Sequence, residues 1–265
     1  MLKKKIFNNQ ILIDYITKSP NFKIILLFTI LTSIYGVVAI GSRQTTFFEM
    51  IVLAHNNTYY NIMFFSILTV NTINTCRIFM NNYAYVTRLE TRKKYLKELL
   101  KIVIEVNLIL ILINILSYLA ILVLVKLDKI KIKKYLNYNI NNLNYSIFLL
   151  LKYYIFAIIL SSINTLIYEY LNENKTMIID LVFIALFGLD ISSIFTKEQY
   201  FSILPWSYYR FKDYITFQNE LISTISFFLI LSIILLVIFL VVSKRKKLLY
   251  RNLNNKVVKN NENRN

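Results

Sequence analysis

Six stretches rich in apolar residues, each about as long as a membrane span, alternate with polar and charged segments along the chain. They cover residues 22–40, 61–80, 102–125, 146–168, 176–195 and 220–242. A helix needs about 20 mostly apolar residues to cross a bilayer. The pattern therefore predicts an all-α, polytopic integral membrane protein with six transmembrane helices. Only 3 Gly and 2 Pro occur among 265 residues, which favours continuous helices over broken ones.

The segment before the first span is too polar to cross a membrane but has helical periodicity. Phe7, Ile11 and Tyr15 recur at intervals of four between polar residues. This pattern predicts an interfacial helix over residues 6–17. Ser19 and Pro20 follow, in the order typical of a helix N-cap and first helical residue, so the first span is expected to begin there.

A basic segment, residues 83–101, separates the second span from the third. Its apolar residues Val86, Leu89, Leu96 and Leu99 have near-helical spacing. Its charges predict an amphipathic helix at the cytoplasmic membrane face that runs into the third span. Two interpretations remain open, a basic segment that only sets topology and a docking element for a cytoplasmic partner. The candidate docking residues are Arg88, Leu89, Arg92, Lys93, Lys94 and Leu96.

Composition agrees with a membrane protein and bears on its orientation. Apolar residues make up 57% of the chain and mean hydropathy is +0.53. The net charge of +17 lies in short segments beside apolar spans, where the positive-inside rule and anionic lipids explain it, so no nucleic-acid partner is expected. With both termini cytoplasmic, 21 of 31 Lys and Arg residues lie inside. The lysine-rich loop at residues 126–145 would then face outward, against the trend.

The domain organisation is simple. Residues 1–250 form one predicted membrane domain in the cell membrane, and residues 251–265 form a basic tail. Known catalytic motifs are missing from the sequence. One histidine, His55, cannot supply an HExxH zinc motif and is interpreted as an ordinary loop residue. Cys76 lies in an apolar run and is expected to be a buried, inert thiol. We therefore expect no enzymatic activity, cofactor or metal site.

Polar residues inside the predicted spans are the remaining candidates for function. Such residues either hydrogen-bond between helices or line a path through the membrane. The candidates are Asn71, Asn74, Asn107, Asn114, Asp180 and Asp190. Both interpretations stay open for them.

The layout over residues 1 to about 250 resembles the membrane-spanning permease subunit of a type-2 ABC exporter. The resemblance covers the interfacial helix, the six spans and the basic segment, where RLETRKKYL takes the place of a coupling helix. The segment SILPWSYYRFKDY, within residues 196–219, occupies the position of a re-entrant hairpin. The resemblance implies an exporter of a peptide, antibiotic or lipid-like substrate, with a separate cytoplasmic ATPase subunit and a second permease copy.

A different class of function is the alternative. The chain would then be a non-transporting immunity or assembly protein that binds a partner within the bilayer. An ATPase gene beside its own gene would favour the exporter, and the absence of one would favour the alternative. An intramembrane enzyme is disfavoured by the missing motifs.

Overall fold

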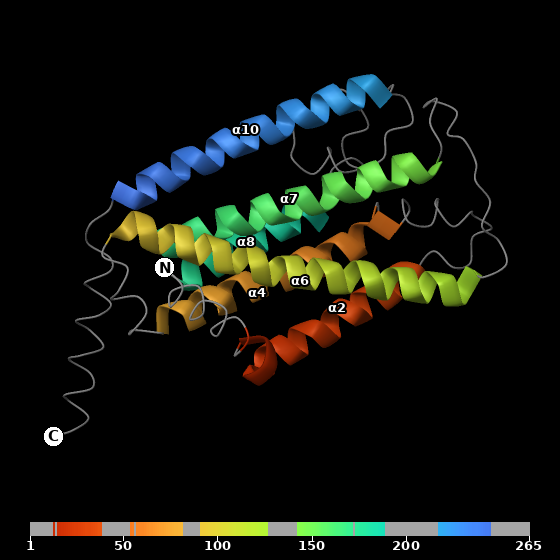
Figure 1. Cartoon of the computed structure of the whole chain (residues 1–265), viewed down its shortest axis with the longest axis horizontal. Coiled ribbons are helices and arrows are strands. Elements are labelled where there is room, and N and C mark those ends of the chain that lie inside the picture. The colour runs from red at the N-terminus through yellow and green to blue at the C-terminus, as the bar shows by residue number, and fades with distance from the viewer. Residues whose placement is uncertain are drawn as a thin grey trace.

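The computed structural model describes residues 13, 15–38, 54–55, 57–81, 91–126, 142–171, 173–188 and 217–244, and these residues contain helices and no strand. Figure 1 shows the long helices lying side by side as a bundle. Their bounds are α2 Pro20–Val38, α4 Thr58–Asn81, α6 Arg92–Lys126, α7 Asn142–Leu171, α8 Glu173–Gly188 and α10 Phe217–Lys244.

Side-chain caps define where three helices begin. Ser19 Oγ accepts a hydrogen bond from Phe22 N at 3.4 Å, so the predicted cap of α2 is confirmed, with Pro20 as the first helical residue. Asn57 Oδ1 caps α4 by accepting from Tyr60 N at 3.1 Å. At the start of α6, Thr91 Oγ1 accepts from Lys94 N at 3.3 Å.

The chain passes up and down through the bundle. α2 packs on α4 and α6, α4 also packs on α7 and α8, and α10 packs mainly on α7. Figure 1 shows that the starts of α6 and α8 lie at the same end as the last turns of α4, α7 and α10. Helices that follow one another in the chain therefore run in opposite directions, as expected for a polytopic membrane protein.

That shared end of the bundle is basic. Exposed Lys and Arg side chains gather on the helix ends that meet there, and we call this surface the basic end. Its members among the described residues are Lys18, Lys23, Arg77, Lys93, Lys94, Lys97, Lys175 and Lys244. By contrast, Lys152, in the first half of α7, is buried. Among the described residues, exposed Lys and Arg side chains thus concentrate at this end of the bundle.

Five helical segments are long and apolar enough to cross a membrane: Pro20–Val38, Tyr59–Asn81, Arg92–Ile121, Ile147–Leu171 and Thr224–Lys244. Where the sequence predicts a span over residues 176–195, the structure has α8, whose described part is 16 residues long. Sixteen helical residues extend only about 24 Å, less than the roughly 30 Å of a hydrocarbon core. The all-α membrane architecture therefore rests on five candidate spans.

As predicted, the basic helix runs directly into the third span. α6 is a single helix of 35 residues. Its sequence contains neither Gly nor Pro, so nothing interrupts its backbone hydrogen bonding. Arg88 and Leu89 lie outside the described residues, as does most of the predicted interfacial helix, in which residues 13 and 15–17 are helical. The residues of the predicted hairpin before Phe217 also lie outside the described part.

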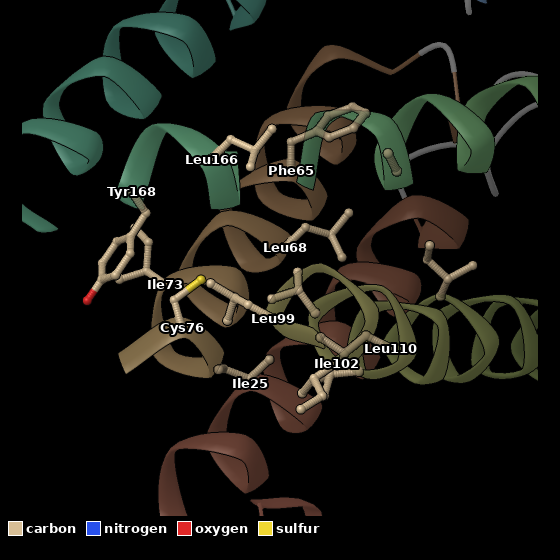
Figure 2. Close-up of a cluster of buried hydrophobic side chains, with 14 of the residues drawn as sticks. Ile25, Phe65, Leu68, Ile73, Cys76, Leu99, Ile102, Leu110, Leu166 and Tyr168 are labelled. Carbon is tan, nitrogen blue, oxygen red and sulfur yellow. The ribbon is translucent and has the colours of Figure 1, made fainter. Parts of the chain in front are cut away.

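Apolar side chains fill the middle of the bundle. Figure 2 shows them converging from four helices, with Ile25 on α2, Cys76 on α4, Leu99 on α6, and Leu166 and Tyr168 on α7. Outward-facing positions are also apolar, and α10 is the least buried of the candidate spans. Because lipid is as apolar as these side chains, burial alone gives little preference for one helix arrangement over another. Polar contacts between the helices must specify it.

Candidate functional site

The first polar cluster joins the second and third candidate spans. Asn71 Nδ2 of α4 donates a hydrogen bond to Asn107 Oδ1 of α6 at 2.6 Å. Asn107 Nδ2 donates in turn to Thr72 Oγ1 at 3.0 Å. All three side chains are fully buried. The pair of amides therefore fixes which face of α4 meets which face of α6.

The residue before α2 that completes this cluster is Tyr15. Its hydroxyl donates to Asn71 Oδ1 at 2.8 Å. Burial raises the pKa of Tyr15 to about 12, and a side-chain hydrogen bond with Thr75 opposes that effect. The phenol therefore keeps its proton at every physiological pH and remains a donor. The end of the predicted interfacial helix is thus anchored to the bundle interior.

A second polar cluster is built around Asn114 of α6. Asn114 Oδ1 accepts hydrogen bonds from the Tyr60 hydroxyl at 2.8 Å and from the Tyr154 hydroxyl at 2.9 Å. Asn114 Nδ2 donates to Ser33 Oγ at 3.0 Å. One amide therefore connects α6 to α2, α4 and α7.

His55 belongs to the same cluster, and the interpretation of it as an ordinary loop residue is wrong. Only 4% of its surface is exposed, and its Nε2 lies 3.2 Å from the Tyr154 hydroxyl oxygen. Tyr154 already donates its proton to the Asn114 carbonyl oxygen, which can only accept. Nε2 must therefore carry a proton and donate it to Tyr154.

Aromatic rings surround the His55 imidazole. Its ring centroid lies 4.9 Å from that of Tyr153, 5.2 Å from Tyr60, 5.6 Å from Tyr118 and 5.8 Å from Tyr154, all in edge-to-face arrangements. These rings come from α4, α6 and α7. They surround the polar centre, and no local pattern in the sequence indicates this because α6 and α7 are distant from His55 in the chain.

Hydrogen bonds between helices stabilise a membrane bundle by about 0.6 kcal/mol each on average and by up to about 1.7 kcal/mol. The two clusters contribute several such bonds between α2, α4, α6 and α7. A further bond runs from Asn164 Nδ2 of α7 to Thr69 Oγ1 of α4 at 3.3 Å. Neither residue was among the candidates predicted from the sequence. The polar side chains therefore supply the specificity that apolar packing cannot.

The other predicted polar candidates lie apart from these clusters. Asn74 is half-buried on α4. Asp180 is buried on α8, with 4% of its surface exposed, and its Oδ2 atom has no hydrogen-bond partner among the described residues. Asp190 lies outside the described residues. The structure thus brings Asn71 together with Asn107 and places Asn114 in its own cluster.

The predicted docking residues divide between two faces of the first turns of α6. Lys93, Lys94 and Lys97 are exposed, and Arg92 is half-buried. Leu96 is fully buried in the bundle core, so its assignment as part of an apolar docking stripe must be corrected. The sequence pattern identifies an apolar face, but that face packs on the protein's own helices. The exposed side chains among the described candidates are the three lysines.

The described residues contain no group of three or more His, Cys, Asp and Glu side chains that could hold a metal ion. Cys76 is a free and buried cysteine. Comparisons with family models, curated proteins and solved structures found no match to this chain. Its function must therefore be inferred from its own residues and geometry.

Proposed function

We propose that the chain is the transmembrane subunit of an ATP-driven exporter, moving a peptide, antibiotic or lipid-like substrate. A separate cytoplasmic ATPase would hydrolyse ATP. The observation that carries the proposal is the start of α6, where Lys93, Lys94 and Lys97 are exposed at the basic end. The same helix continues through the bundle to Asn107 and Asn114, the centres of the two polar clusters.

This continuity supports a mechanism of coupling. A helix of 35 residues is about 52 Å long and transmits an axial displacement along its length. Asn107 and Asn114 lie about four and six turns from Arg92. A push on the lysines by a closing ATPase pair would therefore act on the hydrogen bonds that hold α6 to its neighbours. Two permease copies would enclose the substrate path between them.

Charge reversal tests the docking surface. We expect Lys93→Glu, Lys94→Glu and Lys97→Glu together to weaken binding of the ATPase by about tenfold or more. The three glutamates would then repel the acidic ATPase surface that the lysines are proposed to bind. The measurement is co-purification and affinity after co-expression with the ATPase encoded beside the gene.

A matched control carries the same charge change at the same end of the bundle. The control variant is Lys18→Glu, Lys23→Glu and Lys244→Glu. Lys18 precedes α2, Lys23 lies on α2 and Lys244 lies on α10. This variant should keep the ATPase bound. If the α6 variant inserts normally and still binds the ATPase with unchanged affinity, the docking assignment is wrong.

The proposed topology has six spans with both termini in the cytoplasm. It is supported by the basic end, since cytoplasmic segments are enriched in Lys and Arg. α8 and the residues after it would form the fifth span. We expect a membrane-impermeant maleimide to label Lys97→Cys only from the cytoplasmic side and Tyr59→Cys only from outside. Labelling of both from the same side, or each from the opposite side, would reject this orientation.

The non-transporting alternative is favoured by a different observation. The buried amides of Asn71, Asn107 and Asn114 are satisfied by other residues of the same chain. Such an interior suits a rigid immunity or assembly protein that binds a partner through an outer face. This alternative predicts that the unsubstituted chain binds no ATPase, so the co-purification measurement on that chain separates the two functions.

A further inference from the structure

A hydrogen bond at the basic end joins the start of α6 to the end of α7. The Tyr95 hydroxyl donates to Glu169 Oε1 at 2.8 Å. Only 3% of the Tyr95 surface is exposed, and Glu169 is half-buried. The two residues are 74 positions apart in the chain. This bond therefore depends on the tertiary arrangement of the two helices.

Three helices contribute side chains around this bond. The ring of Phe79, near the end of α4, lies 5.6 Å from that of Tyr95 between centroids. Arg92 is close enough to attract the Glu169 carboxylate electrostatically. The Tyr95–Glu169 bond thus lies beside side chains from α4 and α6.

The first turns of α6 have two distinct faces. Arg92 and Tyr95 are three residues apart and share one face, which meets α7 at Glu169. Lys93, Lys94 and Lys97 are exposed. A partner that binds the lysines therefore leaves the contact with Glu169 in place.

Glu169 lies close to the end of α7, so its bond to Tyr95 reaches the connection between α7 and α8. α7 ends two residues later at Leu171, and α8 begins at Glu173. α8 packs on both α4 and α7. A displacement of Tyr95 is therefore applied at the connection between α7 and α8.

We propose that Tyr95 and Glu169 form a clasp that transmits movement of the first turn of α6 to the connection between α7 and α8. Tyr95 is then a positioning residue, which acts through Glu169 and has no contact with the ATPase. This inference rests on the proposed function for the source of the movement, while the mechanical link itself can be measured without an ATPase. A hydrogen bond to a carboxylate suits the role because it is shorter and stronger than one between neutral groups.

The first experiment measures the link in the chain alone. Spin labels are attached at Lys97→Cys on α6 and at Asn174→Cys on α8, both exposed positions. The unsubstituted chain is the labelling control, because its free cysteine, Cys76, is buried. We expect Tyr95→Phe to widen the distribution of distances between the labels, measured by pulsed electron spin resonance. The ring stays in place while the hydroxyl is lost.

Two further variants make this result specific. Tyr60→Phe also removes a buried hydroxyl with a 2.8 Å hydrogen bond, but in the Asn114 cluster, and should leave the distribution unchanged. Glu169→Gln keeps an acceptor for Tyr95 but loses the charge that attracts Arg92, and should widen the distribution less than Tyr95→Phe. If Tyr95→Phe leaves the distances unchanged, or Tyr60→Phe widens them equally, the clasp is rejected.

The second experiment measures ATP turnover of the ATPase in complex with the chain, relative to the ATPase alone. We expect Tyr95→Phe to keep the ATPase bound with unchanged affinity and to reduce the effect of the chain on turnover by about five- to 150-fold, the usual range of coupling between sites. A variant that loses binding and turnover together, or that keeps both, contradicts a transmitting role. If the unsubstituted chain binds no ATPase, the proposed function fails, while the spin-label result still decides the clasp.

Discussion

Asn114→Leu is expected to lower the free energy of unfolding of the bundle by about 2 kcal/mol. The substitution removes the acceptor of the Tyr60 and Tyr154 hydroxyls and the donor to Ser33 Oγ. Each bond contributes about 0.6 kcal/mol on average within a membrane. Three buried hydroxyl groups also lose a partner, which adds to the loss.

This effect is measured by unfolding the purified protein in detergent micelles with increasing sodium dodecyl sulfate. Asn74→Leu is the matched control, since Asn74 is a half-buried asparagine on α4, outside both clusters. It should change the unfolding free energy by no more than about 0.5 kcal/mol. Equal effects of the two substitutions would show that the Asn114 cluster does not hold the helices together.

Gly36→Val is the second substitution with a large expected effect. A Cβ atom at Gly36 would lie 2.9 Å from Tyr60 Cδ2 and 3.4 Å from Tyr118 Cε2. The Tyr60 ring would have to move, and its hydroxyl is one of the donors to Asn114. Adding bulk to a packed interior typically destabilises by about 1–3 kcal/mol, and we expect the upper part of that range because a hydrogen bond is disturbed as well.

The control for Gly36→Val adds similar bulk to the outer face of the same helix. Val38 is 68% exposed, so Val38→Phe should have little effect on unfolding in sodium dodecyl sulfate. Tyr60→Leu tests the cause, because removing the ring should make Gly36→Val less harmful in the double variant. Strictly additive effects of the two substitutions would show that the Tyr60 ring is not what resists the new side chain.

Helix positions were predictable because each depends on a local signal. The apolar stretch predicted as residues 22–40 corresponds to α2, which begins at Pro20 because Ser19 caps it. The stretch predicted as residues 61–80 corresponds to α4, which starts three residues earlier at Thr58, after the Asn57 cap. Polar caps lie outside the apolar run, so hydropathy alone places such a boundary a turn too late.

The partners of the polar residues were not predictable, because they depend on how each helix is rotated and shifted relative to its neighbours. Asn71 and Asn107 were recognised as candidates, but nothing local indicates that their amides meet. His55 shows the same limit, because its surroundings come from α4, α6 and α7. Leu96 was assigned to the wrong surface because periodicity shows that a face is apolar without showing what covers it.

The Asn114 cluster also bears on when hydrogen bonds between helices can form during synthesis. Ser33 and Tyr60 enter the membrane with α2 and α4, before the ribosome has made α6. Their partner Asn114 lies 81 residues after Ser33 and 54 residues after Tyr60. Until then the first two spans present these hydroxyls without the amide that joins them. The nascent chain thus acquires the bonds that join Ser33 and Tyr60 to Asn114 only when its third long helix leaves the translocon.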